Sequence, residues 1–182
     1  MKSILKYTGL SRRVPTVPNR LSLVLVAPFL ERFFQTLEML DDNTFATVDQ
    51  ATRAVHLLQY LVSGQSDTAE HLLVFNKILC GLPINLPVPR SIELTQEEVE
   101  LVNFLLQTVL QNWEIMKNSS VENLRGAFLL RDGRLVEEQG RWVLVVEAKS
   151  YDIVVDYLPW TISVLQLPWM EKRIEVDWKT KA

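Results

Sequence analysis

The stretch LPWTISVLQLPWM, residues 158–170, carries most of the information about the fold. It contains the tripeptide Leu-Pro-Trp twice, on either side of a short run rich in branched apolar residues. Proline lacks a backbone donor and fixes φ, so Pro159 and Pro168 each mark the edge of an element. Each is followed by a tryptophan, Trp160 or Trp169, which has a large apolar area to bury. The pattern predicts a short strand or buried connection between two defined corners, and it is not typical of an active site.

Helical spacing of apolar residues dominates the chain before this stretch. Boxes of a Ser or Thr followed three residues later by Glu or Gln open three of the predicted helices, at Thr47, Thr95 and Ser119. Asp67 can cap a fourth, and the run LSLVLVA, residues 21–27, is a buried strand or extended lead-in. The expected helices cover about 28–40, 47–63, 68–80, 95–116 and 119–128.

The hydrophobic period changes to that of strands after the last predicted helix. Asp132-Gly133 carries a hairpin signal, and alternation or β-branched residues predict strands at 141–147, 153–155, 162–167 and 174–178. Helices first and antiparallel strands last predict an α+β fold, in which a helical hairpin over 47–63 and 68–80 and the long helix over 95–116 pack on the sheet. We expect a basic arm over 1–20 and one globular domain over 21–182, helical over 28–128 and mostly β over 129–178.

The chain has 182 residues, of which 48% are hydrophobic, which suits one globular domain. Its net charge of −3 is unevenly spread, because residues 1–20 hold five basic side chains and no acidic one. Arg12 and Arg13 are the centre of this arm. The arm either reaches an acidic or phosphate-bearing partner, or it is a solvated arm or the cut end of a longer chain.

The residues that usually carry chemistry are few and poorly placed for it. The glycines lack the spacing of a nucleotide-binding turn, and one cysteine with two histidines, His56 and His71, cannot form a standard zinc site. Cys80 with either histidine could make a nucleophile–base pair, but a helix C-terminus disfavours its thiolate. We expect no catalytic, cofactor-binding or metal site, and a small Cys-dependent enzyme is the weaker alternative.

Three features of the sequence bear on the cellular compartment of the protein. The single Cys80 allows no intrachain disulfide, and no apolar run reaches the length that spans a bilayer. Residues 21–30 follow a basic segment as in a signal peptide, but Pro28 interrupts them and no cleavage site follows. We therefore expect a cytoplasmic chain without a membrane partner.

Five tryptophans and seven phenylalanines could stack on single-stranded nucleic acid, but that mode needs interleaved basic residues. Residues 140–170 offer only two, which disfavours nucleic acid. We expect Trp160 to lie mainly in the core. Trp169 and Met170 are the better candidates for a partner contact, followed by Trp160, Arg12 and Arg13.

The order of several motifs resembles the contractile injection system tape measure protein family, whose members belong to phage-tail-like particles. The similarity covers about residues 21–178 and ends at Trp178. The segments that carry it are LVLVAPFLERFF (23–34), RAVHLLQYLVSGQ (53–65), EHLLVFNKILCGLP (70–83), ELTQEE (93–98), WEIMKNSSV (113–121), LRGAFLLRDGRL (124–135) and LPWTISVLQLPWM (158–170).

The resemblance implies a structural protein without catalytic residues or cofactor. It implies a place on the particle axis near the tube end, spike or baseplate, with proteins of those parts as partners. A homo-oligomer of cyclic symmetry, a trimer or hexamer, is expected, assembled in the cytoplasm and then incorporated into the particle. Even a fully helical chain of 182 residues would span only about 270 Å. The chain is therefore expected to be the globular domain of a ruler or a short adaptor, and an adaptor or cargo-binding protein that uses the basic arm remains the alternative.

Overall fold

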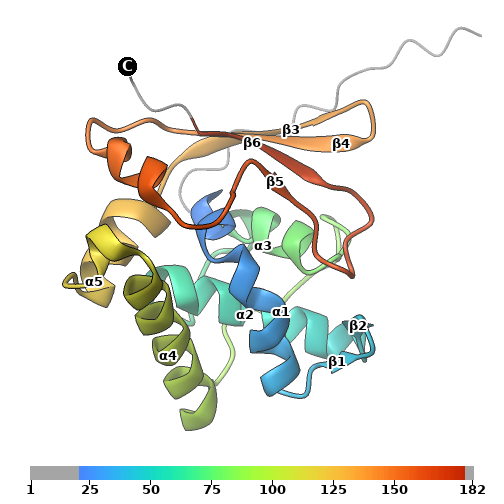
Figure 1. Cartoon of the computed structure of the whole chain (residues 1–182). Helices are drawn as coiled ribbons and strands as arrows, with labels where there is room; N and C mark the ends of the chain where they lie inside the picture. The colour runs from blue at the N-terminus through green and yellow to red at the C-terminus, as the bar shows by residue number, and fades with distance from the viewer. Residues whose placement is uncertain (1–20, 179–182) are drawn as a thin grey trace, which may run out of the picture.

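The computed structural model describes residues 21–178, in which helices come first and the longer strands come last. Figure 1 shows a sheet across one end of a layer of helices. The expected α+β class is confirmed. Predictions that concern residues 1–20, including Arg12 and Arg13, lie outside the described residues.

The first element differs from its prediction. Leu21–Leu25 forms a 3₁₀ helix, η1, in which the Val26 N–H donates to the carbonyl of Leu23 over 3.0 Å. The expectation of a strand or extended lead-in is wrong, because an uninterrupted apolar run of this length fits either structure once it is fully buried. Leu23 and Leu25 are both 0% exposed.

Helix α1, Ala27–Thr36, has Pro28 in its first turn as expected but ends before Leu40. Glu38 adopts a positive φ of 54°, which takes the chain out of the helix. The chain then forms a small antiparallel hairpin, which the sequence did not indicate. Its strands are β1, Leu40–Asp41, and β2, Thr44–Phe45.

Helix α2, Val48–Ser63, has both of its predicted ends. The Thr47 side chain accepts a hydrogen bond from the Gln50 N–H, and Gly64 closes the helix with a left-handed φ of 69°. The Arg125 guanidinium donates to the Leu61 carbonyl over 2.9 Å, so it satisfies one of the last carbonyls of the helix.

The single helix expected over 68–80 is two shorter ones, η2 at Glu70–Leu72 and α3 at Val74–Leu79. Asp67 does not cap either of them. Its carboxylate pairs with Arg90, and its backbone forms an isolated bridge with Ser91. The tertiary contact with the following loop therefore replaces the expected local cap.

Helix α4, Gln96–Asn112, begins with the complete predicted capping box. The Thr95 hydroxyl accepts from the Glu98 N–H, and the Glu98 carboxylate accepts from the Thr95 N–H. A 3₁₀ turn, η3, follows at Glu114–Met116. The next helix, α5 at Val121–Leu124, is capped by Ser120 rather than Ser119 and continues as a π-helical turn, η4, at Arg125–Leu129.

The main hairpin turns at a different place from the predicted one. Strands β3, Gly133–Glu138, and β4, Arg141–Val146, are joined by Gln139 and Gly140, which have φ values of 49° and 80°. Two central residues with positive φ are typical of a tight hairpin turn. The Asp132-Gly133 signal is wrong, because Gly133 is the first residue of β3.

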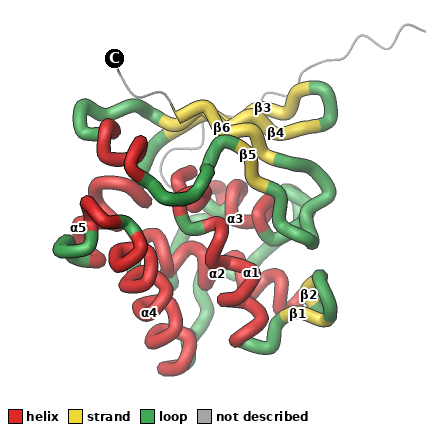
Figure 2. Tube along the Cα trace, in the orientation of Figure 1, coloured by secondary structure: helices red, strands yellow, loops and turns green. Residues whose placement is uncertain are grey.

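Four strands form the sheet in the order β3-β4-β6-β5 (Figure 2). Strand β6, Ile174–Trp178, is confirmed and pairs parallel to β4, so the sheet is mixed rather than wholly antiparallel. Strand β5, Val164–Leu165, is shorter than expected. The strand predicted at 153–155 is wrong, since residues Asp152–Tyr157 form a 3₁₀ helix, η5.

One cluster of buried apolar residues runs from Leu23 to Ile174 and joins the helices to the sheet. Leu144 on β4 is 0% exposed and faces this cluster, as its alternating pattern predicted. The C-terminal stretch therefore closes the core that the helices begin.

Candidate functional site

The first Leu-Pro-Trp corner packs on the N-terminal helices. The indole N–H of Trp160 donates to the carbonyl of Leu25 over 3.0 Å, which is a contact across 135 residues of sequence. Its ring meets the Phe29 ring edge-on, with centroids 5.1 Å apart. Trp160 is only partly buried, so it closes the edge of the core and leaves part of its ring accessible.

The second corner packs on the end of α3 and on the small hairpin. The Trp169 indole N–H donates to the carbonyl of Leu79 over 2.8 Å, and its ring lies against Phe34 and Phe45. A Cβ at Gly81 would lie 2.8 Å from the Trp169 carbonyl oxygen, so only glycine allows this approach. The corner is thus fixed by a hydrogen bond, ring packing and close backbone contact.

Met170 offers almost no surface beside this corner. It is 6% exposed, and its sulfur accepts a hydrogen bond from the Leu167 N–H. Trp169 keeps a partly exposed ring. A partner contact at these two residues stays a prediction. Of the two side chains, Trp169 is the more accessible.

A hollow of about 660 Å³ lies beside Trp169. Glu137 of β3 and Lys172 form an ion pair at it, and Trp142 of β4 contributes an aromatic wall. Residues 81–85, which follow α3, also line it. Its lining combines apolar and aromatic side chains with the side-chain amide of Asn85 and a charged pair.

A second hollow, of about 370 Å³, separates α1 from α4. Phe29 and Phe33 line it from α1, and Leu101 and Phe104 line it from α4. Phe104 is 68% exposed, an unusual position for a large apolar ring on a helix. The apolar walls indicate another surface on which protein could pack.

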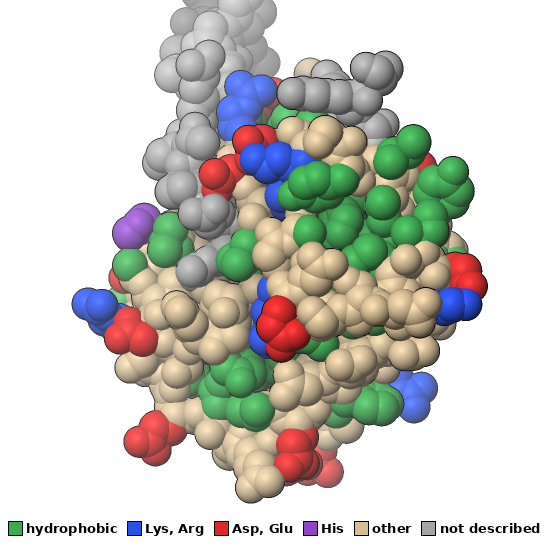
Figure 3. Space-filling view, turned by 90° about the vertical axis from the view of Figure 1, so that its left-hand side faces the viewer, with side chains coloured by type: hydrophobic (Ala, Val, Ile, Leu, Met, Phe, Trp, Pro, Cys, Tyr) green, Lys and Arg blue, Asp and Glu red, His purple; other side chains and the backbone are tan. Residues whose placement is uncertain are grey.

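Helix η5 carries a third exposed apolar surface. Ile153 is 61% exposed and Tyr157 is 60% exposed. Figure 3 faces this side of the molecule and shows apolar side chains gathered on it. Exposed apolar groups of this size near one another are a feature of contact surfaces.

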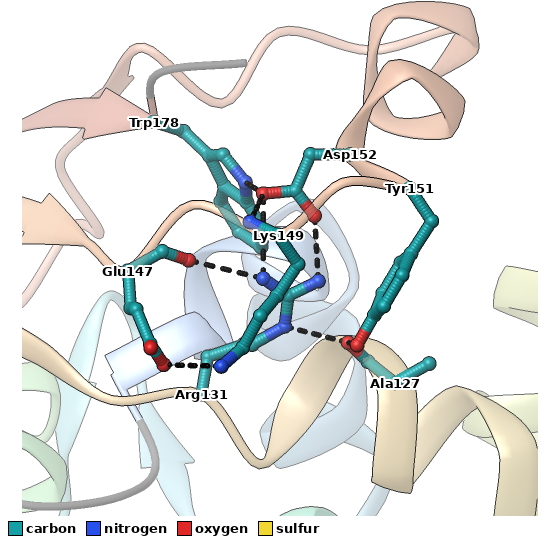
Figure 4. Close-up of polar contacts among 7 residues, drawn as sticks. All are labelled: Ala127, Arg131, Glu147, Lys149, Tyr151, Asp152 and Trp178. Carbon is teal, nitrogen blue, oxygen red and sulfur yellow. Dashed lines mark hydrogen bonds and ion pairs between the residues drawn. The ribbon is translucent and has the colours of Figure 1, made fainter. Parts of the chain in front are cut away.

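The strongest polar cluster is a buried ion pair beneath η5 (Figure 4). The Arg131 guanidinium donates to both carboxylate oxygens of Asp152, over 2.6 and 3.3 Å. It also donates to the carbonyls of Ala127 and Glu147, and the Trp178 indole N–H donates to Asp152. Arg131 and Asp152 are 1% and 0% exposed in their side chains.

Burial alone would raise the pKa of Asp152, but its hydrogen bonds and Arg131 outweigh burial and hold that pKa below its ordinary value. Three aromatic rings surround the guanidinium, with the Tyr151 ring centroid 4.9 Å from it. Because every charge is paired and no solvent reaches the carboxylate, this cluster joins η4, η5 and β6 structurally. Asp152 precedes the apolar run 153–155, so the sequence alone predicts that it faces solvent or ends a strand, and that prediction is wrong.

The residues considered for chemistry are not arranged for it. Cys80 is buried, and burial raises the pKa of its thiol well above the ordinary value. His56 is 0% exposed, and burial lowers the pKa of its ring, whereas His71 is exposed. Nowhere between residues 21 and 178 do three His, Cys, Asp or Glu side chains gather closely enough to hold a metal ion.

Among residues 21–178, no helix combines the length and apolar character that a bilayer crossing needs.

Lys77 is a buried charged residue that the sequence did not single out. Its ammonium group donates to Glu70 and to the carbonyls of Ile84 and Leu86. It holds the proline-rich loop that forms one side of the hollow beside Trp169.

Comparison with known families identifies the chain over most of its length. The family model described as contractile injection system tape measure protein matches residues 23–178. No match is found among curated proteins or among solved structures.

Proposed function

The chain belongs to the contractile injection system tape measure protein family, and we propose that it forms the globular part of a tape measure-type protein on the particle axis. Its place there is near the tube end, the spike or the baseplate. The observation that carries this proposal is the family match over residues 23–178, which includes both Leu-Pro-Trp corners. The proposed role is structural and needs no catalytic group.

The dimensions of the described helices bear on this role. The longest, α4, has 17 residues and therefore a length of about 26 Å. No helix among residues 21–178 is long enough to act as the ruler of a long tube. We therefore propose that the described part is an end domain or adaptor.

We place the contact with tube, spike or baseplate subunits at the hollow beside Trp169. Trp169 supplies an accessible aromatic ring, and tryptophan is prominent among residues that dominate binding energy at interfaces. Trp160 is the second candidate. A position on the axis of a symmetric tube would favour several copies around that axis, so we propose a trimer or hexamer of cyclic symmetry, assembled in the cytoplasm before incorporation.

A gene deletion tests the role. We expect the deletion strain to give fewer particles or particles of irregular length in electron micrographs, and the wild-type gene to restore them. Purified wild-type particles should contain the chain. Normal particles from the deletion strain, together with absence of the chain from wild-type particles, would contradict the proposal.

Cross-linking tests the contact. A photoreactive amino acid at Asn85, which lines the hollow, should cross-link to a tube, spike or baseplate subunit in assembled particles. The matched control places the same group at Gln111, an exposed position on α4. Equal cross-linking from both positions, or none from Asn85 in particles that contain the chain, would remove the hollow from the proposal.

A further inference from the structure

The two outer strands of the sheet differ in how they are protected. In the described residues, β3 pairs only with β4 and β5 pairs only with β6, so each has one unpaired edge. Strand β3 carries charged side chains at Arg134, Glu137 and Glu138. Charges on an outer strand discourage another strand from pairing with it.

Strand β5 has no such protection. The residues from Thr161 to Gln166 include no charged side chain, and Val164 is 54% exposed. Pro159 and Pro168 bound this segment but leave its middle free of proline. Strand β5 itself has two residues, so the part of this segment with strand geometry is about 7 Å long.

The register shows which backbone groups face outward. The Val176 N–H donates to the Ser163 carbonyl over 2.8 Å, so Ser163 and Leu165 direct their backbone groups toward β6. In antiparallel pairing the residues between them direct theirs to the other side. Among the described residues, no hydrogen bond reaches the backbone N–H or carbonyl of Val164 or Gln166.

A hollow of about 290 Å³ lies along this open side. Val24, Ala27 and Pro28 form one wall, and the segment that contains β5 forms the other. No residue of β6 lines it. In Figure 1 the β5 segment passes between the sheet and α1.

Glu31 is the one charged side chain among the described residues that line this hollow. Its carboxylate accepts a hydrogen bond from Gln35, and no ion pair joins it to a described residue. An occupant with a basic side chain at this point would satisfy it.

We propose that β5 accepts an extended segment from a different subunit of the particle, which adds a fifth strand to the sheet. The segment pairs through its backbone with Val164 and Gln166, places an apolar side chain in the hollow, and sets a basic side chain against Glu31. Unpaired backbone groups specify a strand rather than a helix as the occupant. This inference rests on the proposed function, because it takes the occupant from the particle.

Hydrogen exchange, read residue by residue, tests the proposal on the full chain, alone and in purified particles. The Val164 and Gln166 amides should exchange quickly in the free chain and at least about tenfold more slowly in particles. The Leu165 amide, which already faces β6, should change less. If Val164 and Gln166 exchange equally fast in both samples, the proposal is wrong.

Two variants extend the test. V164K places a charge on the open edge and should reduce the amount of chain in particles several-fold, whereas V164T keeps a β-branched side chain and should not. E31K reverses the charge of the hollow without changing β5 and should act like V164K, with E31Q intermediate. Thermal unfolding of each variant confirms that the chain is folded, and normal incorporation of both V164K and E31K would overturn the proposal.

The outcomes separate the two proposals. Absence of wild-type chain from particles overturns the proposed function and this inference with it. Presence of the chain without protection at Val164 and Gln166 overturns only this inference. Protection of the same amides in the purified chain through self-association would show that the occupant is a second copy and would contradict the assignment to a different subunit.

Discussion

The substitution Asp152→Asn should destabilise the fold strongly although it changes only one heavy atom. The neutral amide retains an oxygen for the Trp178 indole N–H, but it removes the charge that faces Arg131. The guanidinium then stays 1% exposed without a counter-charge, and its partners are neutral oxygens and aromatic rings. A buried cation without a counter-charge is costly because its desolvation is no longer offset.

Removal of one member of a buried ion pair typically costs about 3–5 kcal/mol. Domains have free energies of unfolding of about 5–15 kcal/mol, so the variant should lose a large share of its stability. Replacing both partners, Arg131→Met with Asp152→Leu, removes the unpaired charge as well. We expect this double variant to be more stable than Asp152→Asn, because apolar packing can replace a buried pair at little cost.

Urea unfolding followed by tryptophan fluorescence measures these differences. The matched control is Asp67→Asn, the same change in the exposed pair with Arg90, which should leave the unfolding midpoint unchanged. Equal effects of Asp152→Asn and Asp67→Asn would refute the reasoning, since burial is what distinguishes the two pairs.

The pH dependence of stability tests the contribution of the Arg131–Asp152 ion pair independently. Because the pKa of Asp152 is lowered in the folded state, the unfolded chain takes up its proton first as the solution is acidified. The stabilisation by the ionised Asp152 carboxylate is complete above about pH 3.9, the pKa of an aspartate in the unfolded chain. It is lost as the pH falls through the lower pKa of the folded state. Asp152→Asn should therefore lose less of its remaining stability between pH 5 and about pH 2 than the wild type does.

Two further predictions concern α2 and its surroundings. Gly64→Ala should lower the free energy of unfolding in urea by about 1 kcal/mol, because φ at this position is 69° and a Cβ would lie 3.2 Å from Arg125. The control Gly126→Ala places its Cβ in open space and should be neutral or slightly stabilising. Burial lowers the pKa of His56, so stability should fall as the pH drops below about 6.5, where the unfolded chain binds the proton first. His56→Gln should weaken that dependence, and an unchanged pH profile in this variant would contradict the prediction.

The elements that sequence reasoning predicted well are those whose ends are chemically marked. Thr95 and Glu98 form the predicted box, and Thr47 with Gly64 sets both ends of α2. These signals act within four residues, so no knowledge of the tertiary structure is needed. The alternating pattern of β4 succeeded for a similar reason, because one face of the strand is buried and the other is not.

The failures occurred where tertiary contacts decide between local alternatives. The run 153–155 is rich in β-branched residues, yet it lies in η5, where Asp152 is held by Arg131 and Val154 accepts a hydrogen bond from Trp113. Those partners are 21 and 41 residues away in sequence, and a local pattern carries no information about them. The parallel pairing of β4 with β6 was missed for the same reason.

The two Leu-Pro-Trp corners were recognised from sequence, but their pattern did not show what lies between them. Trp160 and Trp169 each donate an indole hydrogen bond to a carbonyl at the end of a helical element, Leu25 of η1 and Leu79 of α3. Helix ends have carbonyls without intrahelical partners, so both tryptophans satisfy groups that would otherwise lack a donor.

These two fixed points determine the position of the segment between them. With both corners held on the helices and Leu165 paired to β6, the backbone of Val164 faces outward with no described partner. A single mobile loop could turn these groups to solvent in many ways, whereas a segment held at both ends presents them in one geometry. The corners thus prearrange an open strand edge, and this lowers the entropy cost of adding a strand from another subunit.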